Sequence, residues 1–199
     1  MRAALHYRAP LPALVLAWKE RASAALLAPM AAALAEAIAD AVLDGLSSEA
    51  NYPLTHPRLL LVPVPSTPAA VRRRGHDAVG VLAASAARLL CPPAPRARAR
   101  ADTSLQGQAP VRVAALLRHA RAVVDQAGLS TLDRQENLAG AFQVHRRRAV
   151  GLRELLVVVV DDVVTSGSTL TEATTAMHLA GFHVVGAAAL ADATRRPRV

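Results

Sequence analysis

The feature that most constrains the fold is an apolar run that leads directly into two acids and a cluster of small residues, VVVVDDVVTSGSTL at residues 157–170. Residues 155–160 do not alternate between apolar and polar side chains and are mostly β-branched, which predicts a parallel strand buried on both faces. Carboxylates are costly to bury without a partner. We therefore expect the strand to end before Asp161 and Asp162, which places both acids at its carboxyl edge, where open α/β sheets bind ligands.

The small residues after the acids predict a turn with room for an anion. A helical pattern comes next, ends near Gly181 and leads into a second apolar run, so the whole stretch is typical of a βαβ unit. Such a turn directs free backbone N–H groups, hydroxyls and the positive end of a helix dipole at one point, which suits a phosphate. The residues of this expected phosphate loop are Val164, Thr165, Ser166, Gly167, Ser168 and Thr169.

The acidic motif has two interpretations at the level of its residues. A strand-to-helix turn with a capping aspartate is the simpler one, but a cap needs only one acid. The pair Asp161 and Asp162 lies outside the phosphate cradle, where it would repel an anion but accept hydrogen bonds from hydroxyl groups. A phosphorylated sugar carries both kinds of group, and the motif therefore favours such a ligand.

A second cluster is basic and lies between an expected strand at residues 58–64 and an expected helix at residues 77–90. Proline ends the strand because it removes a ladder donor, and Ser66 or Thr67 could cap the segment after it. Guanidinium groups match phosphate oxygens bidentately, and a glycine lets the backbone approach an anion. The cluster is either a solvated basic turn or a pyrophosphate grip, and the phosphate loop elsewhere in the chain favours the grip. Its expected residues are Pro65, Ser66, Arg72, Arg73, Arg74 and Gly75.

The acidic pair with its Thr/Ser/Gly loop resembles the fingerprint of the type I phosphoribosyltransferases. In that family the two acids hold the ribose 2′- and 3′-hydroxyls of phosphoribosyl pyrophosphate (PRPP), and the loop binds its 5′-phosphate. The resemblance implies that Asp161 and Asp162 are the catalytic residues and that Mg²⁺ binds through PRPP, without a dedicated set of protein ligands. It also implies an α/β type I phosphoribosyltransferase fold, with a mostly parallel twisted sheet flanked by helices.

Two further stretches are similar to the ComF family, phosphoribosyltransferase-like proteins linked to competence for DNA uptake. One is Pro-Val-Pro followed by Arg-Arg-Gly at residues 63–75, and the other is residues 116–144. The second stretch implies a flexible loop that closes over PRPP, with candidate residues Arg118, Gln126 and Arg134. Many ComF proteins begin with a cysteine-rich zinc segment, which the lone Cys91 of this chain cannot supply.

Composition decides between partner classes only in part. A net charge of +8 favours anionic partners, either PRPP or the backbone of a nucleic acid. Aromatic residues make up only 3%, so a base-stacking surface is not expected, and any single-stranded DNA would be held by arginine–phosphate contacts. The resemblance to the phosphoribosyltransferases implies transfer of the phosphoribosyl group of PRPP to an unidentified nucleobase or amine, with release of pyrophosphate. The ComF resemblance leaves a second interpretation open: a PRPP-sensing or DNA-uptake accessory protein with little turnover, with a competence helicase or a second copy of the chain as partners.

The chain is predicted to form one domain of 199 residues with an α/β core at residues 58–190. Residues 1–50 are expected to form an Ala-rich helical cap, with two helices broken near Pro29. The longest charge-free stretch there, residues 22–35, is too short to span a bilayer, and no signal peptide is recognisable. We therefore expect no membrane contact and a cytoplasmic location.

Overall fold

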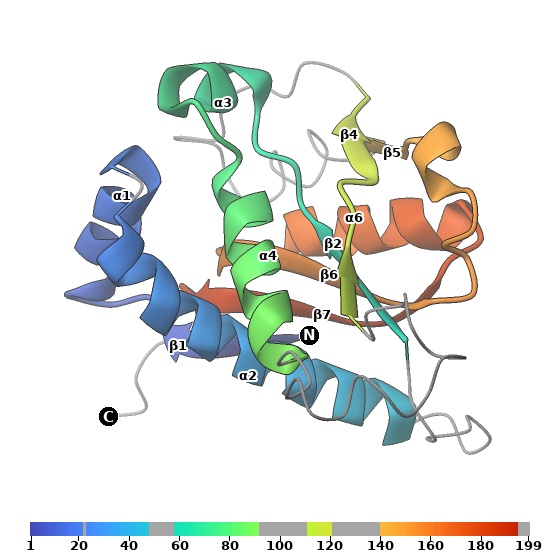
Figure 1. Cartoon of the computed structure of the whole chain (residues 1–199), viewed down its shortest axis with the longest axis horizontal. Coiled ribbons are helices and arrows are strands. Elements are labelled where there is room, and N and C mark those ends of the chain that lie inside the picture. The colour runs from blue at the N-terminus through green and yellow to red at the C-terminus, as the bar shows by residue number, and fades with distance from the viewer. Residues whose placement is uncertain (22, 48–57, 92–110, 121–139, 195–199) are drawn as a thin grey trace, which may run out of the picture.

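The computed structural model describes residues 1–21, 23–47, 58–91, 111–120 and 140–194, and its centre is a five-stranded sheet (Figure 1). All neighbouring strands of this sheet run parallel, in the order β1-β7-β6-β2-β3. Their bounds are Arg2–His6 for β1, Leu59–Pro63 for β2, Val111–Val113 for β3, Leu156–Val164 for β6 and His183–Asp192 for β7. A separate antiparallel pair consists of β4 (Leu117–His119) and β5 (Phe142–Val144).

Helices cover both faces of the large sheet. The helices are α1 (Leu11–Arg21), α2 (Ala24–Ser47), α3 (Pro68–Arg74), α4 (Ala78–Leu90) and α6 (Ser168–Leu179), with a short 3₁₀ helix η1 (Arg146–Ala149). α2 and α4 pack together on one face, and α6 packs on the other beside the β4–β5 pair (Figure 1). The predicted α/β class, with a mostly parallel sheet flanked by helices, is confirmed.

Two separate cores explain why the central strands are apolar without alternation. In β2, Leu59 and Leu61 belong to the core that contains α2 and α4, whereas Leu60 and Val62 belong to the core that contains α6. Successive side chains of a strand point to opposite faces, so both sets must be apolar when both faces are covered. Fully burying each Leu or Val contributes roughly 1.5–3 kcal/mol. The prediction of strands buried on both faces is therefore confirmed.

α2 approaches β7 closely at two glycines. A Cβ atom on Gly45 would lie 2.1 Å from the carbonyl oxygen of Val185, and one on Gly186 would lie 3.0 Å from the carbonyl oxygen of Ala41. Both oxygens belong to the backbone and cannot rotate away. Because Gly45 and Gly186 have no side chains, α2 can pack this closely against β7.

We expect Gly45→Ala to lower the free energy of unfolding by about 1–3 kcal/mol, because the added methyl group must push α2 away from β7. Urea denaturation followed by circular dichroism measures the change. In an open helix the same substitution would raise stability by roughly 1 kcal/mol through helix propensity alone. A variant more stable than the parent would therefore contradict the close packing of α2 on β7.

β6 is longer than predicted, and the expectation that it ends before the acids is wrong. The strand continues through Asp161 and Asp162 to Val164. It does so because β7 keeps pairing with it as far as the Val164–Asp192 register, after β2 has ended at Pro63.

The amino-terminal helices also differ from expectation. The break between α1 and α2 falls between Arg21 and Ala24, and Pro29 lies inside α2, in its second turn. A proline near the start of a helix removes a single i→i−4 hydrogen bond, which a long, well-packed helix tolerates. The strand β1, which pairs with β7 at the sheet edge, is a feature that the sequence pattern did not reveal.

α2 has 24 residues, longer than the charge-free stretch within it suggests. By length and composition alone it is long and apolar enough to cross a membrane, a test that core helices also meet. Its buried side chains, among them Leu34 and Ile38, pack in the core with β7 and α4, which already accounts for its apolar composition.

Candidate functional site

The carboxyl end of β6 is open on one side because β2 stops early. The Val64 N–H donates to the carbonyl oxygen of Val160 at 2.9 Å, the last contact between these strands among the described residues. Beyond it, Asp161 to Val164 pair only with β7. The Pro65 carbonyl oxygen, on the segment that leads away from β2, lies 3.0 Å from Nε2 of His119 in β4. This leaves the acidic end of β6 accessible to Lys19 of α1 and to the charge of Asp77, just before α4.

Asp162 is buried and forms an ion pair with α1. Its Oδ2 lies 2.5 Å from Nζ of Lys19, and the two side chains keep 9% and 21% of their exposed surface. Removing either partner from such a pair leaves an uncompensated charge. Lys19 is also the only lysine in a chain that otherwise uses arginine for its positive charges. The ion pair explains how β6 can carry Asp162 inside the fold.

Asp161 is partly exposed, but burial of its carboxyl group is the main reason why its pKa is raised to about 8. The nearby charge of Asp162 acts in the same direction, and that of Asp77 adds to it. The N–H of Asp162, which donates to Asp161 Oδ1 at 2.8 Å, and the charge of Lys19 both oppose the rise in pKa. At pH 7 the Asp161 carboxyl therefore holds a proton and can donate a hydrogen bond as well as accept one.

The raised pKa of Asp161 predicts that stability depends on pH. The folded protein holds this proton up to about pH 8, whereas the unfolded chain releases it near the ordinary value of 3.8. The stabilising contribution is thus complete below about pH 4 and is lost as the pH rises towards 8. Asp161→Asn cannot ionise and keeps the oxygen that accepts from the Asp162 N–H.

We expect Asp161→Asn to be more stable than the parent at pH 8 by at least about 1 kcal/mol, since one pKa unit corresponds to about 1.4 kcal/mol. The difference should disappear near pH 4. Urea denaturation of both proteins across this range measures it. A variant that loses stability with rising pH as steeply as the parent would show that Asp161 is not the group responsible.

The expected phosphate loop is a tight turn into α6. Thr165 and Ser166 are exposed, and Gly167 has a φ of 79°, a left-handed conformation that favours glycine at this position before the helix. The hydroxyl oxygens of Ser166 and Ser168 lie 2.8 Å apart. Ser168 and Thr169 belong to the first turn of α6 and do not precede it as expected. The Ser168 N–H donates to the Ser166 hydroxyl oxygen at 3.4 Å, a long hydrogen bond. The first N–H groups of an α-helix have no partner within the helix, which makes this end of α6 suitable for an anion.

The predicted basic turn is a short helix, α3, and this part of the prediction is wrong. Thr67 caps α3 by accepting from the Ala70 N–H at 3.3 Å, and Pro68 occupies the first position, where proline is favoured. The three arginines form the last turn of the helix. Gly75 then ends it with a φ of 76° and donates its N–H to the Val71 carbonyl oxygen at 2.8 Å. The three arginines are consecutive in this turn, so their side chains spread around the helix axis.

α1 joins the basic helix to the acidic strand. Glu20 Oε1 accepts hydrogen bonds from Arg74 Nε at 2.9 Å and from Arg73 Nη2 at 3.2 Å. These bonds also lower the pKa of Glu20. Its neighbour Lys19 holds Asp162. The arginines of α3 and the acidic pair of β6 are almost ninety residues apart in the sequence. They are joined in the fold through Lys19 and Glu20, which are adjacent on α1.

The start of α4 completes this side of the site. Ser66 donates its hydroxyl hydrogen to Oδ1 of Asp77 at 2.8 Å, and Asp77 immediately precedes α4. The charge of Asp77 contributes to the raised pKa of Asp161, so the segment around Ser66 lies within electrostatic reach of the acids. Of the predicted pyrophosphate residues, Ser66, Arg73 and Arg74 thus have described contacts that lead to the acidic pair.

Three residues were predicted to belong to a flexible loop over the ligand. Gln126 and Arg134 lie outside the described residues. Arg118 is on β4, where its guanidinium donates to Oε1 of Gln143 at 2.6 Å. Among the described residues, no hydrogen bond or ion pair joins Arg118 to the acidic pair or to α3.

The site contains residues that sequence reasoning did not single out as ligands. They are Lys19, Glu20, Asp77 and Asp192. Asp192 is buried at the end of β7 opposite Val164, and its carboxylate accepts hydrogen bonds from the N–H and hydroxyl of Thr194 at 2.7 and 2.6 Å. The one signal in the sequence was the presence of a single lysine.

Comparison with known proteins agrees with this geometry. Residues 105–198 match the family model described as the phosphoribosyl transferase domain. The matched stretch includes the acidic pair and the phosphate loop, whereas α1 and α3 lie before it. No curated protein matches the chain. The carboxyl-terminal half of this parallel α/β fold is thus similar to a phosphoribosyl transferase domain.

Proposed function

We propose that the protein binds PRPP together with Mg²⁺ and transfers its phosphoribosyl group to a nucleobase or an amine, with release of pyrophosphate. The convergence of the acidic strand and the basic helix on Lys19 and Glu20 carries this proposal. A phosphate loop, a carboxyl pair and an arginine pair then correspond to the three parts of PRPP: its 5′-phosphate, its ribose and its pyrophosphate.

In this proposal PRPP replaces the internal partners of the site. A ribose hydroxyl takes the place of Lys19 at Asp162, and the protonated Asp161 donates to or accepts from a second hydroxyl. The pyrophosphate takes the place of Glu20 at Arg73 and Arg74. The pyrophosphate is an anion like the Glu20 carboxylate that it replaces. At Asp162 a neutral hydroxyl replaces the Lys19 ammonium, so opening that ion pair costs part of the binding energy.

The transfer itself breaks the bond between ribose C1 and the pyrophosphate oxygen, whose electron pair leaves with the pyrophosphate. A new bond forms from C1 to the nitrogen of the acceptor, which then releases a proton. The carboxylate of Asp162 stabilises the positive charge that develops at the ribose, and Arg73 and Arg74 stabilise the departing pyrophosphate.

Mg²⁺ would supply charge neutralisation at the pyrophosphate. The oxygen donors that Mg²⁺ prefers are available from PRPP and water. Among the described residues, no group of three or more His, Cys, Asp or Glu side chains is placed to hold a metal ion by itself. The proposed ion therefore enters with its substrate.

A PRPP-sensing protein without turnover is the second candidate function. It is favoured by two sets of ion pairs that already occupy the proposed ligand groups. Lys19 pairs with Asp162, and Glu20 pairs with Arg73 and Arg74. A ligand must open both sets in order to bind. Pyrophosphate release from Mg²⁺-PRPP, measured with a panel of nucleobases and amines, separates the two. A transferase releases pyrophosphate above the acceptor-free rate with at least one acceptor. PRPP binding without release for every acceptor would contradict transfer and support sensing.

The finer parts of the proposal rest on the sequence resemblance and on charge. We propose membership of the ComF family, a link to DNA uptake and a cytoplasmic location. We also propose single-stranded DNA, a competence helicase or a second copy of the chain as partners. The net charge of +8 supports an anionic partner such as DNA, bound through phosphate contacts that weaken steeply with salt.

A further inference from the structure

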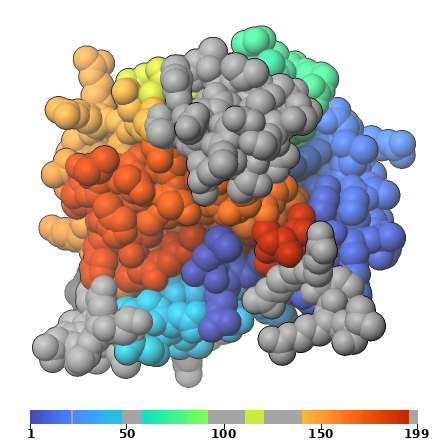
Figure 2. Space-filling view, turned by 180° about the vertical axis from the view of Figure 1, so that it is seen from behind, coloured from blue at the N-terminus to red at the C-terminus, as the bar shows by residue number. Residues whose placement is uncertain are grey.

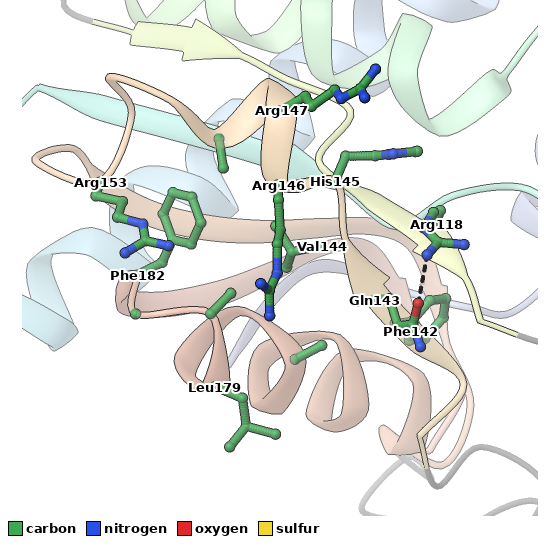
Figure 3. A pocket seen from close by; sticks show the side chains of 14 residues that line it. Arg118, Phe142, Gln143, Val144, His145, Arg146, Arg147, Arg153, Leu179 and Phe182 are labelled. Carbon is green, nitrogen blue, oxygen red and sulfur yellow. Dashed lines mark hydrogen bonds between the residues drawn. The ribbon is translucent and has the colours of Figure 1, made fainter.

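A hollow lies at the opposite end of α6 from the phosphate loop (Figure 3). It has a volume of about 970 Å³ and is bordered by β4, β5, the 3₁₀ helix η1, the end of α6 and the start of β7. Figure 2 shows the outer face of this region, where the segment around η1 (light orange) stands beside the orange and red surface of α6 and β7. A hollow of this size is within the range of small-molecule binding sites, about 300–1,000 Å³.

Arginines dominate the charge of the hollow. They are Arg118, Arg146, Arg147 and Arg153. Figure 3 shows Arg146 reaching from η1 towards α6 and Arg153 lying beside Phe182, whereas Arg147 points away from α6. Within the described part of the chain, no Asp or Glu lines the hollow and no carboxylate pairs with any of the four.

The end of α6 does not cancel this charge. A helix carboxyl end carries the equivalent of roughly half a negative charge, which is less than one guanidinium. The last carbonyl groups are also occupied, because the N–H groups of Gly181 and Phe182 donate to His178 and Met177 at 2.9 and 3.1 Å. The Arg153 guanidinium lies over this turn, where a Cβ on Gly181 would be 3.7 Å from its NH1. The hollow is therefore positive.

The wall of the hollow is apolar and partly aromatic. Phe142 and Phe182 lie beneath its surface, on β5 and on the segment before β7, and keep 5% and 3% of their exposed surface. At the rim Leu179 is 84% exposed, a large apolar side chain that gains nothing from facing water. Arginines that only face solvent would not need to lie in a hollow or beside apolar side chains. This combination is typical of sites that hold a flat ring and an anion together.

The hollow is separate from the proposed PRPP site. α6 has 12 residues, so its two ends are about 18 Å apart at 1.5 Å per residue. The phosphate loop begins α6, and the hollow lies at its end. A small ligand in the hollow cannot reach the acidic pair at the same time.

We propose that this hollow binds a nucleoside di- or triphosphate. Guanidinium groups bind phosphate oxygens bidentately, and Arg146 and Arg153 extend into the hollow without a carboxylate partner among the described residues. The base lies against the apolar wall near Phe182 and Leu179, and the phosphates lie between the two arginines. Inorganic phosphate would contact only the arginines of the hollow, and an uncharged nucleoside would contact only its apolar wall.

Titration calorimetry with adenosine triphosphate, tripolyphosphate and adenosine tests the proposal. We expect adenosine triphosphate to bind more tightly than tripolyphosphate, and adenosine not to bind. Arg146→Gln combined with Arg153→Gln should weaken adenosine triphosphate at least about tenfold, because each charge-assisted contact is worth about that factor. The matched control is Arg88→Gln with Arg112→Gln, which removes two exposed arginines outside the hollow and should leave the affinity unchanged.

Four results would overturn the proposal. One is the absence of adenosine triphosphate binding, and a second is an equal loss of affinity in the two arginine variants. Another is loss of adenosine triphosphate binding in the folded variant Asp161→Asn with Asp162→Asn, which would place the nucleotide in the PRPP site. The last is single-stranded oligonucleotide binding that the Arg146 and Arg153 changes abolish while adenosine triphosphate binding is unaffected, which would make the surface a nucleic-acid contact.

Discussion

Replacing Asp161 and Asp162 together with asparagine is expected to weaken PRPP binding at least about hundredfold, because two hydrogen bonds between ribose and carboxyl groups, one to a charged acceptor, become weaker. Asparagine preserves shape, and β6 retains its pairing with β7, so the fold should persist. Calorimetric titration with Mg²⁺-PRPP, after thermal melting has confirmed a folded variant, measures the change.

The control for the acidic pair is Asp40→Asn with Asp44→Asn. These two acids are exposed on α2. Their removal raises the net charge by two, which is more than the acidic-pair variant does at pH 7, where Asp161 is already protonated, and PRPP affinity should stay close to that of the parent. Asp162→Asn leaves Lys19 without its charged partner and is the riskier half of the variant. Asp161→Asn alone keeps that ion pair and should still weaken PRPP. Unchanged affinity in the folded double variant would remove the acids from the site.

Arg73→Gln combined with Arg74→Gln should weaken PRPP by at least about hundredfold, since each of the two lost charge-assisted hydrogen bonds is worth about 1.5–3 kcal/mol. The same variant should bind ribose 5-phosphate as the parent does, because that ligand has no pyrophosphate. Calorimetry with both ligands gives the two affinities. Equal losses for both ligands would indicate a general field effect and not a pyrophosphate grip.

Glu20→Gln provides a change in the opposite direction. It removes the carboxylate that occupies Arg73 and Arg74, so PRPP should bind a few-fold more tightly if those arginines hold the pyrophosphate. Arg88→Gln with Arg112→Gln again serves as the control for lost positive charge. Weaker binding in Glu20→Gln would mean that Glu20 positions the arginines for the ligand and does not compete with it.

The parts of the fold that depend on local pattern were predictable. The uninterrupted apolar run of β6, the helix after the phosphate loop and the stop at Gly181 all depend on neighbouring residues, and the structure contains them. The longer reach of β6 was not predictable in this way. It depends on β7 extending to Asp192 and on Lys19 meeting Asp162, both of which are tertiary contacts.

The same distinction applies to α3 and to the site. A proline after Thr67 is a recognised helix start, but the short run after it also fits a turn, so the arginines were placed in the wrong local structure. Lys19 and Glu20 are distant in sequence from the residues they hold, and nothing in their own stretch distinguishes them except the absence of other lysines. Single-sequence patterns report local structure, whereas these pairs are formed by the packing of α1.

α1 therefore has a larger part in the site than its sequence suggests. It lies outside the stretch that matches the phosphoribosyl transferase domain, yet it supplies a cation to the acidic pair and an anion to the basic helix. In the proposed function, both contacts give way when PRPP binds.

The measurement that tests the proposed function most directly is calorimetric titration of the unmodified protein with PRPP, with and without Mg²⁺, beside ribose 5-phosphate and pyrophosphate. We predict that PRPP binds more tightly than either fragment, because the phosphate loop, the acidic pair and α3 act on one molecule, and that Mg²⁺ strengthens its binding. No binding of PRPP in the presence of Mg²⁺, or binding no tighter than that of pyrophosphate alone, would contradict the proposed function.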